Sequence, residues 1–453
     1  MLARHGDREP QLQMPLDPTN WTALGELTPI GMNQHYNLGR EVVGRYGEII
    51  PRHFSDREIY IRSTNYNRAL MSAYSQLQGI FPPGSGPSIE GTTTPALPDS
   101  VQVRPQQQRL ICFTAGSCPQ PVPIVTVPIA AEYLLRPFEI CPSALGLLQG
   151  LVFERAPFAS MWAAQQPLCR TLEGLTGLGP GALADPFTLT MVADTFRVAR
   201  AKGRPLPAGV TDDIYNRTVT LGEAVFVACM PLEPRWFQLA MGPFADEVPA
   251  PTLPPHLYPP LVASSRARHI LWPSRFLCLP LLSNMEADLA GSAARRRYRL
   301  YSAHDDTIMA YMAAVGQPLT EWLPYAANVV WELHGPDTNH SEAFVRILYN
   351  PGPSLAAPRP VPHRGCAGNE CTLTQFHQAL RAIAAGPGWL GDLCGVEGAP
   401  GAGSTFGAGA LAATIIEAAA LGAVALLSAV AWRARRTFSP SAAPRHAWGR
   451  AEF

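Results

Sequence analysis

The sequence predicts an α/β fold, a doubly wound sheet with a helical cap insertion and a C-terminal transmembrane helix. A β-rich run at 59–64 is followed by apolar residues at helical spacing, and a second such strand–helix unit begins at 298. The apolar pattern between them, over 125–242, is mostly helical. Strand–helix units that flank a helical insertion are typical of a layered α/β domain.

The first helix is expected directly after Thr28-Pro29, because Thr is a good N-cap and Pro fits the first turn. A second helix should cover 66–80, after the strand at 59–64. In the C-terminal third, a strand at 298–303 precedes a helix that begins near Asp306.

Two further β-rich runs, 329–334 and 343–349, predict a hairpin across a Gly-Pro-Asp turn.

The amino-acid composition restricts the classes of partner, cofactor and cellular compartment that we expect. Lys+Arg and Asp+Glu both number 35 in 453 residues, so the net charge is zero and a nucleic-acid partner is not expected. The nine cysteines form no CxxC pairs, and we expect neither a metal nor a cofactor. Glycosylation sequons at Asn20, Asn216 and Asn339 favour an oxidising, secreted or lumenal compartment.

An apolar stretch at 408–432 is long enough to span a bilayer, and Arg433 follows it at once. Basic residues on that side mark 433–453 as cytoplasmic, so we expect a single-pass type I membrane protein. Since the sequence opens without a signal peptide, a truncated or misassigned start is also expected. The expected domains are a discontinuous core (1–124 and 243–394), a helical cap (125–242), a tether (395–407), the membrane helix and the tail.

Polar, reactive residues stand where three predicted strands end: Arg4-His5-Gly6, Arg62 and His304-Asp305. The carboxyl ends of parallel strands form a crevice in which helix N-termini favour anions, so we expect these residues to converge. Arginine forks suit phosphate oxygens, and imidazole can act as a nucleophile. Taken singly, each has an ordinary reading: a charged tail, a solvated or salt-bridged arginine, a helix cap. Together they predict a phosphate site.

Four segments together resemble the histidine acid phosphatases, and the similarity spans roughly residues 3–394. They are Arg4-His5-Gly6-Asp7-Arg8-Glu9-Pro10, Leu27-Thr28-Pro29-Ile30-Gly31-Met32, Tyr60-Ile61-Arg62-Ser63-Thr64 and Tyr301-Ser302-Ala303-His304-Asp305-Asp306-Thr307. In topology the chain is most similar to the membrane-anchored lysosomal, testicular and prostatic types. The resemblance implies a phosphoglycerate-mutase-like fold and hydrolysis of phosphomonoesters.

The resemblance also implies roles for the site residues. His5 would form a phosphohistidine intermediate, and Asp305 would protonate the leaving alkoxide. The phosphoryl oxygens would be held by Arg4, Arg8, Arg62 and His304. Neighbouring arginines would keep His5 unprotonated in acid, whereas Asp305 must be protonated, which favours a low pH optimum.

By the same resemblance the expected disulfides are Cys141–Cys394 and Cys366–Cys371, with Cys112–Cys118 as a candidate local loop closure. Three cysteines remain unassigned: Cys169, Cys229 and Cys278.

The chain departs from the family pattern in four places. Only residues 1–3 precede the Arg-His-Gly loop, so the central strand is expected to be mostly missing. Asn65 and Asn67 stand where aspartates are common, which would leave Arg68 without a charged partner. Asn328 replaces a usual cysteine, so one family disulfide is expected to be absent.

The leading hypothesis is a membrane-anchored acid phosphatase whose catalytic domain is lumenal or extracellular, in lysosomes or endosomes or at the cell surface. Its substrates would be small-molecule or protein phosphomonoesters, and a homodimer is a further option. Two alternatives stay open. One is a relative with narrower specificity, such as a phytase-like, sugar-phosphate or lipid-phosphate hydrolase. The other is an inactive ectodomain that acts as a binding or receptor surface.

Overall fold

The computed structural model describes residues 1–86, 120–141, 143–230, 236, 239, 296–335, 342–366 and 368–382. All of them belong to the unit Met1–Ala402. Within these ranges no helix is both long and apolar enough to cross a membrane. The predicted membrane segment at 408–432 lies outside them.

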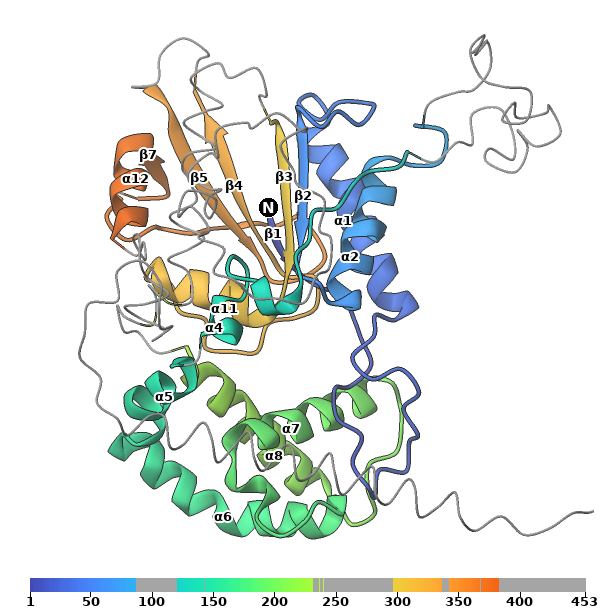
Figure 1. The fold of residues 1–453 in the computed structure, drawn as a ribbon, viewed down its shortest axis with the longest axis vertical. Helices are drawn as coiled ribbons and strands as arrows, with labels where there is room; N and C mark the ends of the chain where they lie inside the picture. Colours follow the sequence, from blue (N-terminus) through green and yellow to red (C-terminus); the bar gives the residue numbers. More distant parts are fainter. Residues whose placement is uncertain are drawn as a thin grey trace, which may run out of the picture. The chain divides into compact units, whose positions relative to one another are not determined.

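A mixed seven-stranded sheet forms the centre of the fold (Figure 1). Its strands are β1 (Leu2–Arg4), β2 (Ile59–Ser63), β3 (Tyr298–Ala303), β4 (Asn328–His334), β5 (Phe344–Asn350), β6 (Arg359–Pro360) and β7 (Glu370–Thr372). The order is β2-β3-β1-β4-β5-β6, with β7 paired to β5. Strands β1, β2 and β3 run parallel, whereas β4 and β5 form the predicted antiparallel hairpin.

In the described part of the chain, four helices accompany the sheet: α1 (Pro29–Tyr46), α2 (Asn67–Ile80), α11 (Asp305–Ala314) and α12 (Leu373–Arg381). Figure 1 shows α1 and α2 side by side next to β2. The chain between α2 and β3 is helical, as expected, over α4 (Pro137–Ile140), α5 (Ala144–Leu148), α6 (Ala156–Thr176), α7 (Pro186–Ala201) and α8 (Asp212–Ala228), with short helical turns at Ile129–Ala131, Gln149–Phe153 and Ala182–Ala184. The predicted mixture of sheet and helices is confirmed.

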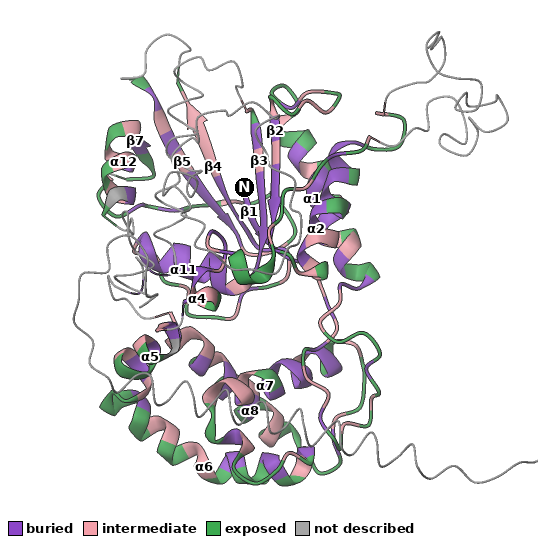
Figure 2. Cartoon of the chain, in the orientation of Figure 1, coloured by how far each residue is buried: buried purple, intermediate pink, exposed green. Residues whose placement is uncertain are grey.

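The middle of the sheet is buried: β1 is buried at every residue and β2 and β3 at all but one residue each (Figure 2), whereas both residues of β6 are exposed. Because strand side chains alternate between faces, Leu2 and Ala3 enter different cores. Leu2 joins Ile308 of α11, whereas Ala3 joins Leu38 of α1 and Leu77 of α2. The sheet is therefore covered by helices on its two sides.

The central strand is short in the structure. Strand β1 has only three residues, yet it lies between β3 and β4 and pairs with both. The Arg4 N–H donates to Ala327 O at 2.9 Å, and Tyr301 N–H donates to Met1 O at 2.8 Å. A strand this short suffices because its backbone groups find partners on two sides.

The loop after β1 packs directly on the start of α1. Thr28 caps α1 by accepting from Gly31 N–H, as its sequence predicts, and its hydroxyl also donates to Asp7. A Cβ on Gly31 would lie 2.3 Å from Asp7 O, and a Cβ on Gly6 would lie 2.4 Å from Gly31 O. Glycine at both positions lets the two backbones touch.

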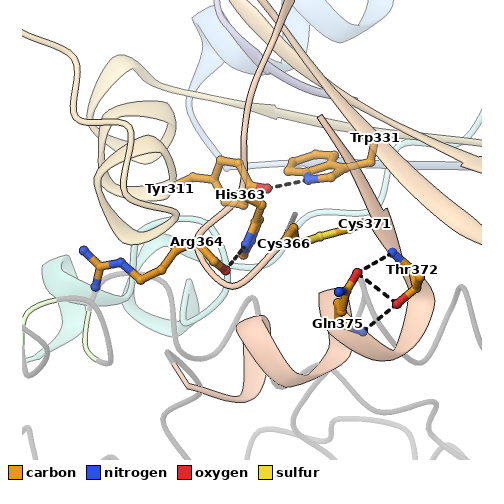
Figure 3. The surroundings of a disulfide bond; sticks show 8 residues. All are labelled: Tyr311, Trp331, His363, Arg364, Cys366, Cys371, Thr372 and Gln375. Atoms are coloured by element: carbon orange, nitrogen blue, oxygen red, sulfur yellow. Dashed lines mark hydrogen bonds between the residues drawn. A yellow bond between two sulfur atoms is a disulfide. The ribbon is translucent and has the colours of Figure 1, made fainter. Parts of the chain in front are cut away.

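The described disulfide, Cys366–Cys371, joins the loop after β6 to β7, close to Trp331 and Gln375 (Figure 3). Cys141 is also disulfide-bonded, but Cys394, its expected partner, lies outside the described residues. So do Cys278 and the candidate pair Cys112–Cys118. Two of the unassigned cysteines are free and buried, Cys169 and Cys229.

At the position of the absent cysteine, the Asn350 side chain donates to the Asn328 side-chain oxygen at 2.9 Å.

We predict that Gly31→Ala destabilises the fold by about 2 kcal/mol or more, because its methyl would overlap the Asp7 backbone. It should also lower activity, since the overlap would displace the loop that carries His5. Gly44→Ala is the matched control: it lies on the same helix with nothing within 4 Å of its Cβ. That change should stabilise by about 0.5–1 kcal/mol. Thermal unfolding measures both, and equal effects would contradict the close contact.

Candidate active site

The candidate catalytic residues lie at the carboxyl ends of neighbouring parallel strands. His5 follows β1, and His304 and Asp305 follow β3, whose residue Ala303 pairs with Arg4. The imidazole rings of His5 and His304 have their centroids 5.5 Å apart. The structure thus brings together the first and third of the three predicted segments.

The backbone of His5 is held from both sides. Its N–H donates to Ala303 O at 3.1 Å, and its carbonyl accepts from Ala326 N–H at 3.1 Å. Its ring Nδ1 lies 2.9 Å from Gly6 O. Since a carbonyl can only accept, we assign the proton to Nδ1, which leaves a lone pair on Nε2. His5 therefore presents Nε2 as a potential nucleophile.

Both histidines are neutral at acid pH. Burial lowers the pKa of His5 well below its usual value, and Arg4, Arg68 and Arg8 lower it further. The pKa of His304 is also lowered, mainly by burial and then by the positive charges of Arg136 and Arg68. The Thr64 hydroxyl lies 2.9 Å from Nε2 of His304 and fixes its ring.

Asp305 forms a buried ion pair with the arginine that precedes the nucleophile. Its Oδ2 lies 2.7 Å from Arg4 Nη2 and accepts the Trp322 indole N–H at 3.1 Å. Burial is the largest single influence and alone would raise the pKa of Asp305, but Arg4 together with His5, Trp322 and Arg8 more than offsets burial and holds the pKa below the usual range. Asp305 is therefore ionised in this structure.

Arg8 is paired with a carboxylate from the helical insertion. Its two terminal nitrogens donate to Asp194 of α7 at 2.8 and 3.1 Å, a bidentate contact. Lys202, after the end of α7, contacts Glu9 at 3.0 Å. Helix α7 therefore holds the nucleophile loop at two points.

Arg62 makes a different contact from the one that the resemblance implies. Its Nη2 donates to both carboxylate oxygens of Glu132, at 3.0 and 3.1 Å, and both side chains are buried. Arg62 is also not among the main causes of the pKa shifts of His5 and His304. In the structure Arg62 is thus a salt-bridged arginine. Its role as a ligand of the substrate phosphate stays a prediction.

The arginine that does act on both histidines is Arg68, in the first turn of α2. It lowers the pKa of each, and its guanidinium lies 4.6 Å from the centroid of the Tyr66 ring. Across the described part of the chain it makes no ion pair, as the asparagines at 65 and 67 suggest. Burial together with Arg8 and Arg136 lowers its pKa to about 10.

A second group that the sequence reading missed lies around Arg136. Its guanidinium contacts Asp306 at 2.5 Å and Glu139 at 2.6 Å, and the Tyr66 hydroxyl donates to Glu139 at 3.0 Å. Tyr66 packs edge-on against His304, with centroids 5.1 Å apart. The sequence does carry a signal for this group. Asp306 directly follows the His304-Asp305 pair, and a second buried acid at that place needs a cationic partner.

The arrangement suits transfer of an anionic group. A neutral imidazole with a bare Nε2 lies among buried arginines, and a carboxyl group stands on the adjacent strand end. Preorganised cations of this kind stabilise charge that develops on a transferring phosphoryl group.

Comparisons with known proteins agree with this chemistry. A model of the histidine phosphatase superfamily (branch 2) matches residues 1–122 and 274–350. The chain is 27% identical to lysosomal acid phosphatase of Xenopus laevis, over 85% of this chain and 76% of that protein. It is 29% identical to human testicular acid phosphatase, over 83% and 77%. The phytase of Citrobacter braakii shares the fold, with a TM-score of 0.50 and 15% identity over 84% and 96% of the two chains.

The predicted relationship to the acid phosphatases, which are phosphoric monoester hydrolases, is thereby confirmed. Over these segments the chain matches the histidine phosphatase superfamily, branch 2, and over most of its length it is similar to the acid phosphatases.

Proposed function

We propose that this protein is an acid phosphatase that hydrolyses phosphomonoesters through a phosphohistidine intermediate on His5. The observation that carries the proposal is the state of the His5 ring. Nδ1 is committed to Gly6 O, so Nε2 has its lone pair, and burial with three arginines keeps the ring unprotonated in acid. A nucleophile that survives acid pH is what a phosphatase of this type needs.

In this proposal the substrate phosphoryl group is bound by Arg4, Arg8 and Arg68, with His304 as a further contact. Nε2 of His5 attacks phosphorus in line with the leaving oxygen. Charge-assisted hydrogen bonds to the equatorial oxygens stabilise the transition state, each by about 1.5–3 kcal/mol. Water then hydrolyses the phosphohistidine and releases phosphate.

Asp305 supplies the proton for the leaving alkoxide. Because Arg4 and its neighbours hold Asp305 ionised in this structure, Asp305 must gain a proton when substrate binds. A phosphate dianion beside Arg4 competes for its positive charge and so raises the pKa of Asp305. Binding thereby turns a salt-bridge carboxylate into an acid, and low pH favours the step.

We further propose a lumenal or extracellular catalytic domain on a single membrane helix at 408–432, with a phosphoglycerate-mutase-like core. Supporting this are the apolar stretch with its trailing arginines, the sequons and the Cys366–Cys371 disulfide. The names of the relatives, lysosomal and testicular acid phosphatase, agree with it. Of the sequon asparagines, Asn20 and Asn216 are exposed, and Asn339 lies outside the described residues.

The proposed phosphohistidine intermediate on His5 can be tested directly. His5→Ala should lower kcat for p-nitrophenyl phosphate by about three orders of magnitude or more, because the nucleophile is lost. Rapid quenching of the native protein with a radiolabelled phosphomonoester should trap label that is stable in alkali and lost in acid. His5→Ala should trap none. Full activity in His5→Ala would refute the assignment, and inactivity of the native protein would support the receptor alternative.

The second prediction separates the two arginines. Arg68→Gln should lower kcat/KM about a hundredfold, since it removes a cation from the phosphate site. It should also move the acid limb of the pH–rate profile to higher pH. The reason is the sign of the coupling: Arg68 lowers the pKa of His5, so its loss raises that pKa and protonates the nucleophile sooner.

Arg62→Gln should instead leave the acid limb in place and destabilise the fold by about 3–5 kcal/mol, because Glu132 stays buried and charged. The double variant Arg62→Gln/Glu132→Gln should recover part of that stability. If Arg62→Gln shifts the acid limb and Arg68→Gln does not, Arg62 is the phosphate ligand, as the resemblance implies.

A further inference from the structure

Trp322 lies against the carboxylate to which we assign the general acid. It belongs to the loop between α11 and β4, and its indole N–H donates to Asp305 Oδ2 at 3.1 Å. The same oxygen lies 2.7 Å from Arg4 Nη2. Trp322 is thus a second donor on one oxygen of the acid.

The indole ring is held in place by the helical insertion. It stacks on Phe226 of α8, with centroids 5.0 Å apart and ring planes 18° from parallel. The guanidinium of Arg197, on α7, lies 4.6 Å from the ring centroid. The Trp322 backbone N–H donates to Glu223 Oε1 at 2.6 Å. Ring and backbone are both fixed, so the direction of the N–H is fixed as well.

The two carboxyl oxygens of Asp305 are therefore unequal. A carboxylate oxygen accepts about two hydrogen bonds through its lone pairs. Oδ2 accepts the Trp322 N–H and lies 2.7 Å from the Arg4 guanidinium, whereas Oδ1 accepts the Asp306 backbone N–H at 3.1 Å. The cation and the indole donor both disfavour a proton on Oδ2, so Oδ1 is the oxygen that gains it.

We propose that Trp322 is a positioning residue for Asp305: its N–H stays on Oδ2 when Arg4 turns to the substrate phosphoryl group, so that Oδ1 carries the catalytic proton. This rests on the proposed role of Asp305 as general acid. In the step, the bond from phosphorus to the leaving oxygen breaks while the bond to His5 Nε2 forms. The proton passes from Oδ1 to the leaving oxygen. The carboxylate that remains keeps the Trp322 N–H on Oδ2.

The test uses Trp322→Phe, which retains an aromatic ring for the stack on Phe226 and removes only the N–H. Two substrates are compared by kcat/KM: p-nitrophenyl phosphate, whose leaving group needs little protonation, and glycerol 2-phosphate, whose alkoxide needs it. We expect about a tenfold or greater loss for glycerol 2-phosphate and less than about threefold for the aryl ester. A purely structural role would lower both equally, and equal losses would overturn the proposal.

A further variant, Asp305→Asn, tests the general-acid role of Asp305 separately from the positioning role of Trp322. It should show the same substrate dependence, only larger, and adding Trp322→Phe to it should cause no further difference between the substrates. If Asp305→Asn affects both substrates equally, the acid role itself fails. If it discriminates and Trp322→Phe does not, the positioning role of Trp322 fails alone.

Trp21→Phe is the matched control. It removes another indole N–H bond to an aspartate, 2.9 Å from Asp17 Oδ2, in the loop that follows the nucleophile segment. It should leave the ratio of the two kcat/KM values unchanged. Phe226→Leu is a second variant in case Trp322→Phe does not fold. It keeps the indole N–H but removes its aromatic support, and a smaller loss confined to glycerol 2-phosphate is expected. Equal losses on both substrates would count against the proposal.

Discussion

The buried ion pair between Arg4 and Asp305 joins the strand that carries the nucleophile to the helix that carries the acid. The two residues end β1 and follow β3, so their contact depends on the parallel pairing of those strands. Removing one partner of such a pair costs about 3–5 kcal/mol, because the other charge stays buried. The same arginine helps to keep His5 unprotonated and Asp305 ionised.

The helical insertion completes this site rather than merely covering it. Asp194 from α7 balances the charge of Arg8, and the Arg136 group beside α4 balances Asp306. Without these partners, two buried charges on the nucleophile loop and α11 would be left uncompensated, which is costly in a low-dielectric interior. The insertion also fixes Trp322 through Phe226. We infer that the insertion and the sheet fold as a cooperative unit around these charges.

Much of the fold could be predicted from local signals. Thr28-Pro29 begins α1 where capping rules place it, and the strand and hairpin patterns give β2 to β5. The direction in which a strand side chain points could not be predicted. Arg62 lies in a strand, where neighbouring residues alternate between faces, so its place in the sequence does not say toward which side it points. Arg62 pairs with Glu132, 70 residues away, whereas Arg68, in the first turn of α2, acts on the histidines. The contacts of Trp322 and Asp194 come from distant segments without a periodic pattern, and no local rule reveals them.

The charge pairing of the empty site bears on how substrate enters. In the segments that the structure describes, Arg4, Arg8 and Arg136 each face a carboxylate, whereas Arg68 does not. An incoming phosphate gains most at Arg68, because no ion pair has to be broken there. Contact with Arg4 comes at the expense of Asp305, and it is this exchange that makes protonation of Asp305 favourable. On this view acid pH acts less on the empty enzyme than on the complex. The dependence on proton concentration then arises because substrate and proton replace one salt bridge together.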